Sequence, residues 1–242
     1  MGSAVPYPGH SATPHGAGSD LALTGRVALV SGGDRGVGPQ LVRRLAELGM
    51  RVVLGSRSAE HGRRALDTLG DLADRVAVRQ LDVLDPDSVR RVAAWLRERL
   101  GGCDVLVNDA THRLPGDRGA ARADLDVVRR TLDANLLGPW RLTQAVAPMM
   151  RAQGYGRVVT VCADHDHWRH DGQAAYRVSH SAVQTLTTEL SAELEGLGIL
   201  VNACCVRPPR ESLASTRTPV WLATLPAGGP TGQLFCSPAP AG

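Results

Sequence analysis

Short runs of apolar residues recur along the chain, and most of them are continuous rather than alternating with polar positions. Runs of this kind are typical of strands that are covered on both faces, as in a parallel β-sheet. β-Branched residues, which favour strands, are common within them. The predicted strands are 27–30, 52–54, 76–78, 105–107, 158–161 and 199–204.

The segments between these runs are amphipathic and predict helices. After the first run, Leu41, Leu45 and Leu48 recur at helical spacing, and charged residues occupy the other side. Asp85 followed by Pro86 predicts a helix start, because aspartate caps helix N-termini and proline favours the first helical position. Further helical segments are predicted over 85–100, 124–150 and 174–195.

Strands that alternate with helices predict an α/β protein with a doubly wound parallel sheet, joined by right-handed crossovers and flanked by helices. The chain has 242 residues, which suits one large domain and leaves little room for a second. Residues 1–22 are rich in proline and glycine and have almost nothing to bury, so we expect a disordered tail there. We expect a single folded domain over 23–236 and a second short disordered tail over 237–242.

The composition argues against several classes of protein. No stretch of about 18 apolar residues is present, so no membrane span is predicted, and the absence of a secretory signal predicts a cytoplasmic protein. The five cysteines include no C-x-x-C pair, which argues against a disulfide framework or a zinc site. A net charge of +3, with four Trp, three Tyr and one Phe, provides neither the basic stripe nor the stacking platforms of a nucleic-acid groove.

A glycine-rich segment follows the first predicted strand directly and leads into a helix. Bare backbone in such a strand–turn–helix unit lets a pyrophosphate approach the main-chain N–H groups and the positive end of the helix dipole. The context is that of a dinucleotide-binding loop, although glycines alone also fit a tight turn without a ligand. The predicted phosphate-loop residues are Ser31, Gly32, Asp34, Arg35, Gly36, Val37 and Gly38.

The end of the second predicted strand is followed by Arg57. A site selective for NAD would place an acidic side chain near this position to bind the ribose 2′-hydroxyl, whereas an arginine suits a 2′-phosphate. Arg35 in the loop offers a second contact to the same phosphate. We therefore predict NADP(H) as the cofactor. The alternative is that both arginines are simply exposed.

Over residues 24–235 the chain resembles the short-chain dehydrogenase/reductase family, and 199–205 and 218–223 look closer to its carbonyl reductase branch, which prefers NADPH. The family's T-G-x-x-x-G-x-G loop corresponds to Ser31 through Gly38, and its N-N-A-G segment appears in altered form as Asn108-Asp109-Ala110-Thr111. The resemblance implies a single-domain, Rossmann-like NAD(P)-binding fold over 23–236. It also implies further cofactor contacts at Asp82, Val83, Asn108, Ala110, Tyr176 and His180.

In this family a tyrosine donates a proton to the substrate carbonyl, a serine holds the carbonyl oxygen, a lysine lowers the pKa of the tyrosine, and an asparagine holds a water linked to the lysine. The resemblance assigns the tyrosine to Tyr176 and the asparagine to Asn135, with position 180 on the same helix face as Tyr176. Position 180 is His180, however, and all 27 basic residues of the chain are arginine. The family serine falls at Ala163. Both departures impair the ordinary mechanism, since the loss of one donor to the developing oxyanion typically lowers the rate about 10²–10³-fold.

The segment that follows Ala163 contains three histidines, His165, His167 and His170. Either of the first two offers a replacement proton donor. The three histidines are interpreted equally well as polar residues of an exposed loop without a catalytic role. Because the spacing of these histidines matches no metal-binding motif, no metal site is predicted.

The resemblance predicts an NADP(H)-dependent oxidoreductase that reduces a carbonyl group of a small molecule, or oxidises the alcohol, with Tyr176 as proton donor. Two alternatives stay open. A scaffold that keeps Tyr176 and nearby histidines also suits non-redox chemistry such as cyclisation, isomerisation or dehydration, and the chain also fits a catalytically inactive NADP-binding partner subunit. The helices over 124–150 and 174–195 correspond to the family's usual subunit interface, so we expect a homodimer or homotetramer.

Overall fold

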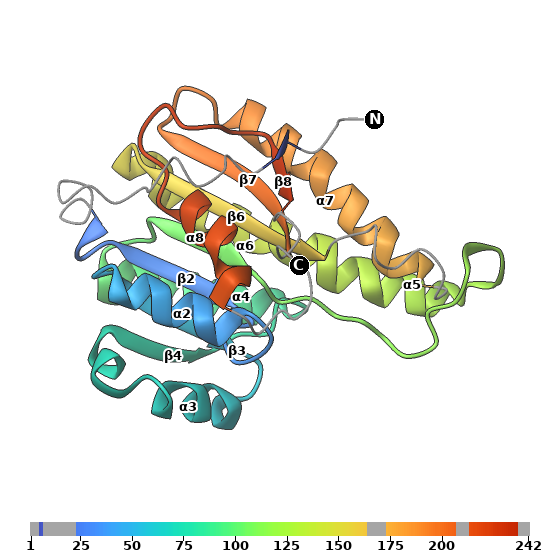
Figure 1. The fold of residues 1–242 in the computed structure, drawn as a ribbon, viewed down its shortest axis with the longest axis horizontal. Coiled ribbons are helices and arrows are strands. Elements are labelled where there is room, and N and C mark those ends of the chain that lie inside the picture. The colour runs from blue at the N-terminus through green and yellow to red at the C-terminus, as the bar shows by residue number, and fades with distance from the viewer. Residues whose placement is uncertain (1–4, 7–22, 164–172, 207–212, 237–242) are drawn as a thin grey trace.

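The computed structural model describes residues 5–6, 23–163, 173–206 and 213–236. In this part of the chain one eight-stranded sheet is formed, and every neighbouring pair of its strands is parallel. Helices cover both faces of the sheet (Figure 1). The arrangement confirms the predicted α/β fold with a doubly wound, Rossmann-like sheet.

Six strands coincide with the six predicted apolar runs, each extended by one to four residues. The agreement has a physical cause: most of these strands lie between two helical layers, so both of their faces are buried and their apolar runs are continuous, whereas the edge strand over 76–80 is only partly buried. Their bounds are β2 (Val27–Ser31), β3 (Arg51–Ser56), β4 (Val76–Gln80), β5 (Val105–Asn108), β6 (Gly156–Ala163) and β7 (Ile199–Val206).

Two short strands are not predicted by the apolar pattern, because two or three residues are too few to show a period. They are β8 (Leu234–Cys236), which pairs with β7, and β1 (Val5–Pro6), which pairs with β8. Val5 and Pro6 therefore lie at the sheet edge, within the segment that we expected to be a disordered tail. The rest of 1–22, and all of 237–242, lie outside the described residues.

The strands are arranged in the order β1-β8-β7-β6-β5-β2-β3-β4. From β2 the chain proceeds outward through β3 and β4, then returns to β5 on the other side of β2 and continues outward through β6 and β7. The loops that follow β2 and β5 therefore leave the sheet in opposite directions. In open α/β sheets, ligands bind in the crevice that forms at such a reversal, outside the carboxyl ends of the strands.

One face of the sheet is covered by α2 (Gly38–Glu47), α3 (Ala59–Asp67) and α8 (Arg217–Ala223) (Figure 1). The sequence predicts α2, and it predicts a helix between β3 and β4, where α3 lies, but it does not predict α8. Helix α3 buries only Gly62 and Ala65. It begins after Ser58, whose hydroxyl accepts a hydrogen bond from the main-chain nitrogen of His61 at 3.3 Å.

The opposite face is covered by α4 (Pro86–Trp95), α6 (Gly138–Gln153) and α7 (Ala174–Glu193), and α5 (Leu125–Leu132) packs against α7. The helix predicted over 124–150 is formed over 125–153, with a π-helical turn at Asp133–Leu137 between α5 and α6. The helix predicted over 85–100 likewise ends in a π-helical turn at Leu96–Leu100. π-Helical turns inside helices are frequent at functional sites, and the first of these contains Asn135. No helix among the described residues has both the length and the hydrophobicity to cross a membrane.

Candidate active site

The glycine-rich loop lies between the end of β2 at Ser31 and the start of α2 at Gly38. Gly32 and Gly36 have φ angles of +72° and +56°, in the left-handed region that favours glycine. A Cβ atom on Gly38 would lie 2.2 Å from the main-chain oxygen of Gly32, so only glycine allows the helix to begin this close to the loop. The main-chain nitrogen of Gly38 donates a hydrogen bond to the oxygen of Arg35 at 2.9 Å. The loop therefore presents bare backbone at a helix N-terminus, where an anionic ligand is stabilised.

Two other predicted loop residues secure this segment to the sheet. Val37 is fully buried in the core beneath α2. Ser31 is also buried, and its hydroxyl accepts a hydrogen bond from the main-chain nitrogen of Ala110 at 3.3 Å. Since Ala110 follows β5, this bond joins the two loops that diverge at the reversal of strand order.

A cavity that opens to solvent lies beside the loop. Its walls come from four segments that are distant in the sequence: the loop after β2 and the segments that follow β3, β4 and β5. Six of the predicted cofactor-binding residues are brought together here. The lining residues are Gly32, Asp34, Arg35, Arg57, Leu81, Val83, Ala110, Thr111 and His112.

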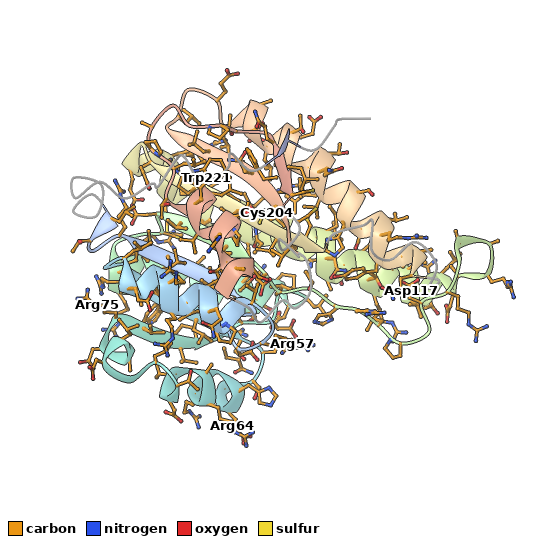
Figure 2. All side chains as sticks on the ribbon, viewed as in Figure 1. Arg57, Arg64, Arg75, Asp117, Cys204 and Trp221 are labelled. Atoms are coloured by element: carbon orange, nitrogen blue, oxygen red, sulfur yellow. The ribbon has the colours of Figure 1, made fainter. Side chains whose placement is uncertain are left out.

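Two guanidinium groups and an imidazole line the cavity. No ion pair between described residues involves Arg57, which Figure 2 shows on the side of the molecule where the strands end. The side chain of Arg35 is half exposed, and a guanidinium nitrogen lies 3.4 Å from a carboxylate oxygen of Asp34. Burial lowers the pKa of His112, and the positive charges of Arg57 and Arg35 lower it further, against the opposing effect of Asp82. An anionic group that entered the cavity beside Arg57 would therefore meet a guanidinium that is in no ion pair with a described residue.

Three of the predicted cofactor residues lie after β4 and at the end of β5. Asp82 accepts a hydrogen bond from the main-chain nitrogen of Leu84 at 3.0 Å through one carboxylate oxygen, and its other oxygen accepts none from a described residue. Val83 is buried in the cavity wall. Asn108 is the last residue of β5 and donates a long hydrogen bond of 3.4 Å to the hydroxyl of Thr160 on β6. Asp82 therefore keeps an acceptor for a ligand. The amide nitrogen of Asn108 is used inside the sheet, whereas its buried amide oxygen has no partner among the described residues.

Tyr176 and His180 lie in the first two turns of α7, one helical turn apart on one face. Their rings meet edge to face, with 4.4 Å between the ring centroids. Both residues are buried, with exposed fractions of 6% and 2%. Neither lines the cavity described above, so the predicted catalytic pair lies beyond its wall.

Asn135 connects this pair to the cavity. Its side-chain oxygen accepts a hydrogen bond from the main-chain nitrogen of His112 at 2.7 Å, and its amide nitrogen donates to the main-chain oxygen of His112 at 3.0 Å. The same nitrogen donates to the hydroxyl of Ser179 at 3.1 Å, and that hydroxyl donates to the main-chain oxygen of Tyr176 at 2.7 Å. Asn135 therefore joins a cavity-lining segment to the helix that carries Tyr176 and His180.

Ala163, at the position of the family serine, is the last residue of β6. The segment 164–172, with His165, His167 and His170, lies outside the described residues. Among the residues that the structure does describe, no group of histidine, cysteine, aspartate and glutamate side chains has the arrangement of a metal site.

Asp117 is a residue near the site that the sequence pattern does not indicate. Its two carboxylate oxygens accept hydrogen bonds from the main-chain nitrogens of Ala175 and Tyr176 at 3.0 Å and 2.9 Å. They cap the first turn of α7, for which Gln173 at the helix start supplies no side-chain cap (Figure 2). Nearly 60 residues separate the partners, so no local motif reveals the contact. His112 also lines the cavity without having been predicted, but its position in the sequence could have indicated it, since it directly follows the altered N-N-A-G segment.

Comparison with protein families gives a match to the family described as short chain dehydrogenase over residues 26–213. Oxidoreductase UcpA of Salmonella typhimurium is 35% identical over 203 residues, which cover 81% of this chain and 76% of that protein. The 3-oxoacyl-[acyl-carrier-protein] reductase FabG of Vibrio cholerae is 31% identical over 182 residues, which cover 75% of this chain and 72% of that protein.

Three solved structures have a fold similar to that of this chain. NAD+-bound xylitol dehydrogenase has a TM-score of 0.71 at 26% identity, over 76% of this chain and 71% of that chain. Serine dehydrogenase from Escherichia coli has a TM-score of 0.76 at 25% identity, over 86% and 95% of the two chains. NADP-bound ElxO shares the fold with a TM-score of 0.80 at 20% identity, over 88% and 96%. The structural relatives therefore include both NAD+-bound and NADP-bound proteins.

Proposed function

Because the chain belongs to the short-chain dehydrogenase family, we propose that it is an NADP(H)-dependent oxidoreductase that reduces a carbonyl group of a small molecule or oxidises the corresponding alcohol. One observation carries the choice of cofactor: Arg57 lines the cavity and forms no ion pair with a described residue. A guanidinium at this position suits a 2′-phosphate, which it can bind through two parallel hydrogen bonds. Arg35 adds a second positive charge to the same wall.

The loop and the cavity wall also offer groups that suit the other parts of the dinucleotide. The glycine loop presents main-chain N–H groups at the N-terminus of α2, and these suit the pyrophosphate. Val83 offers an apolar surface to the adenine ring. Asp82 keeps a carboxylate oxygen that can accept a hydrogen bond from the adenine amino group. Beyond the cavity, the segment held by Asn135 leads toward Tyr176, where the reacting end of the cofactor would lie.

Tyr176 is the proposed proton donor. When bound, the dinucleotide supplies the hydride, and the phenol of Tyr176 supplies the proton that the carbonyl oxygen takes up. Three contacts hold the main chain that carries this phenol: Asn135 binds Ser179, Ser179 binds the oxygen of Tyr176, and Asp117 binds its nitrogen. His180 packs against the phenol ring and limits its orientation.

Two positions limit the rate of the proposed reaction. Ala163 has no hydroxyl to hold the carbonyl oxygen, and the loss of one such donor typically lowers the rate about 10²–10³-fold. His180 replaces a lysine, and an imidazole is mostly uncharged at neutral pH, so it supplies no permanent cation beside the phenol. We therefore expect turnover at least about 10²-fold below that of relatives with the complete set of residues.

A second candidate function is acid–base chemistry without hydride transfer. The buried edge-to-face contact of Tyr176 with His180 favours it, because two side chains that can exchange protons lie together where the family has tyrosine and lysine. Such an enzyme would convert its substrate with no change in nicotinamide absorbance.

Isothermal titration calorimetry with NADPH and with NADH tests the cofactor site. We expect NADPH to bind and the Arg57→Ala variant to bind it at least about tenfold more weakly, because a charge-assisted bidentate contact is lost. Arg63→Ala is the matched control, since Arg63 is an exposed arginine on α3 that does not line the cavity. If the wild-type protein bound neither nucleotide, the proposed function would be wrong.

Nicotinamide absorbance with a panel of aldehydes and ketones tests the chemistry. We expect Tyr176→Phe to lower the rate of NADPH consumption at least about 100-fold while the variant still binds NADPH. Conversion of a compound, detected by mass spectrometry, without NADPH consumption would favour the second candidate. Nucleotide binding without conversion of any compound would favour a cofactor-binding partner subunit.

We further propose that the protein forms a homodimer or homotetramer. Leu125 on α5 and Val178 on α7 are 65% and 55% exposed although both are apolar, and the two helices pack against each other. A second copy that covered these helices would remove both side chains from water. Size-exclusion chromatography with light scattering tests this proposal, and a mass of 25.6 kDa, that of a single chain, would contradict it.

A further inference from the structure

A carboxylate lies at the cationic end of the cavity. Asp34 lines the cavity together with Arg35 and Arg57, and only 2% of its side chain is exposed. Aspartates are rarely this deeply buried unless they are paired or hydrogen-bonded. The contacts of Asp34 therefore decide what the carboxylate does.

The described contacts of Asp34 satisfy only one of its two oxygens. Oδ2 lies 3.4 Å from a guanidinium nitrogen of Arg35 and 3.8 Å from Nδ1 of His61 on α3. Both contacts are long, and the partner side chains are 47% and 57% exposed, so water screens them. Oδ1 is shielded from solvent, and no described residue donates a hydrogen bond to it. Buried polar atoms are normally hydrogen-bonded, so Oδ1 is an acceptor available for a donor that enters the cavity.

The two kinds of charged group in this wall favour different ligands. Arg57 and Arg35 favour a phosphate on the ribose. The carboxylate of Asp34 favours a hydroxyl that can donate to Oδ1, and it opposes a second anion placed nearby. A ribose with a free 2′-hydroxyl satisfies Asp34, whereas one with a 2′-phosphate satisfies the arginines.

We propose that Asp34 is a specificity-determining residue of the cofactor site, whose carboxylate accepts a hydrogen bond from the adenosine ribose and thereby keeps NADH as a second cofactor beside NADPH. The inference rests on the proposed function, because it takes the cavity to be a nicotinamide dinucleotide site. It predicts that the protein discriminates only weakly between the two nucleotides, and it assigns this to one side chain in the phosphate loop. The acidic residue that NAD-selective sites place after the second strand is replaced here by Arg57.

Calorimetric titration of the full-length protein with NADH and NADPH tests the inference. Asp34→Asn keeps the shape of the side chain but removes its charge. We expect it to bind NADPH more tightly and NADH more weakly, so that the ratio of the two dissociation constants moves toward NADPH about tenfold. Asp34→Ser is expected to move the ratio in the same direction. It replaces the asparagine variant in the titration if that variant does not fold. Asp67→Asn is the matched control, because Asp67 is an exposed acid on α3 outside the cavity.

The outcomes separate this inference from the proposed function. If both nucleotides bind the wild-type protein and neither Asp34 variant changes the ratio, Asp34 has no role in selection and the cofactor site still stands. An equal change in Asp67→Asn would assign the effect to net charge and would also overturn the inference. Failure of the wild-type protein to bind either nucleotide would overturn the proposed function and this inference together.

Discussion

The rings of Tyr176 and His180 lie edge to face on the first two turns of α7, with 4.4 Å between their centroids. The contact is closed off from solvent, since both residues are more than nine-tenths buried. In the family to which this chain belongs, the second position holds a lysine. The chain contains no lysine at all, so no neighbouring residue can supply that ammonium group.

Replacement of His180 by lysine should therefore raise the rate of carbonyl reduction. A permanent cation one helical turn from Tyr176 favours the ionised phenol and shifts its reactivity toward neutral pH. We expect a gain in kcat of at least about tenfold at neutral pH, measured from nicotinamide absorbance with a carbonyl substrate found in the screen. His180→Gln, which has a similar size but no charge, should give no gain. Equal rates for the two variants would show that charge at this position does not control the reaction.

The carboxylate of Asp117 should stabilise α7 and the position of Tyr176. An amide has one acceptor oxygen in place of two, so Asp117→Asn can keep only one of the bonds to the main chain of Ala175 and Tyr176. Loss of a helix cap typically lowers the free energy of unfolding by about 1 kcal/mol. For a domain of this size, this corresponds to a fall of about 2–4 °C in Tm. Thermal unfolding followed by circular dichroism measures it. Asp126→Asn, which removes an exposed ion pair with Arg129, should lower Tm much less, and an equal fall in both variants would contradict the capping role.

Gly38 and Gly36 should respond differently to the same substitution. A Cβ at Gly38 would overlap the main-chain oxygen of Gly32, so Gly38→Ala must displace either the loop or the start of α2 and should abolish detectable nucleotide binding. Gly36 has a φ of +56° but open space where its Cβ would lie, so Gly36→Ala should destabilise the protein by only about 1–2 kcal/mol. Calorimetric titration and urea unfolding separate the two effects. Normal NADPH binding by Gly38→Ala would show that the loop does not hold the pyrophosphate.

The stability of the unliganded protein should fall in acid partly because of His112. Burial and two nearby arginines lower the pKa of this residue in the folded state, whereas the unfolded chain takes up the proton near about pH 6.5. The unfolded state therefore binds more protons below that pH, and the contribution of His112 to stability, complete above about pH 6.5, declines as the pH falls toward the lowered folded pKa. Urea unfolding at about pH 7.5 and pH 5.5 should show a smaller loss for His112→Asn than for the wild-type protein. An identical loss would mean that His112 does not contribute.

The apolar pattern predicted most of the fold, and the glycine loop predicted one of the segments that line the cavity. Strands buried on both faces must be apolar throughout, so each of the six runs indicated a strand without any knowledge of its neighbours. The loop could equally be predicted from the sequence, because the positive φ of Gly32 and the close approach of Gly38 to Gly32 are local requirements that only glycine meets. Arg57 was located by its distance from the end of a predicted strand.

Other features depend on contacts between segments that are far apart in the chain. Asp117 reaches α7 across nearly 60 residues, and Asn135 binds segments 23 residues before it and 44 residues after it, so no spacing along the chain reveals either contact. The π-helical turn around Asn135 was hidden for the same reason, since its sequence suits a continuous helix. Asp34 looks like an ordinary polar loop residue, and its burial follows from the packing of four segments around one cavity. Local conformational preference specified the elements and the loop, whereas the environment of each charged group was set by which distant segments pack around it.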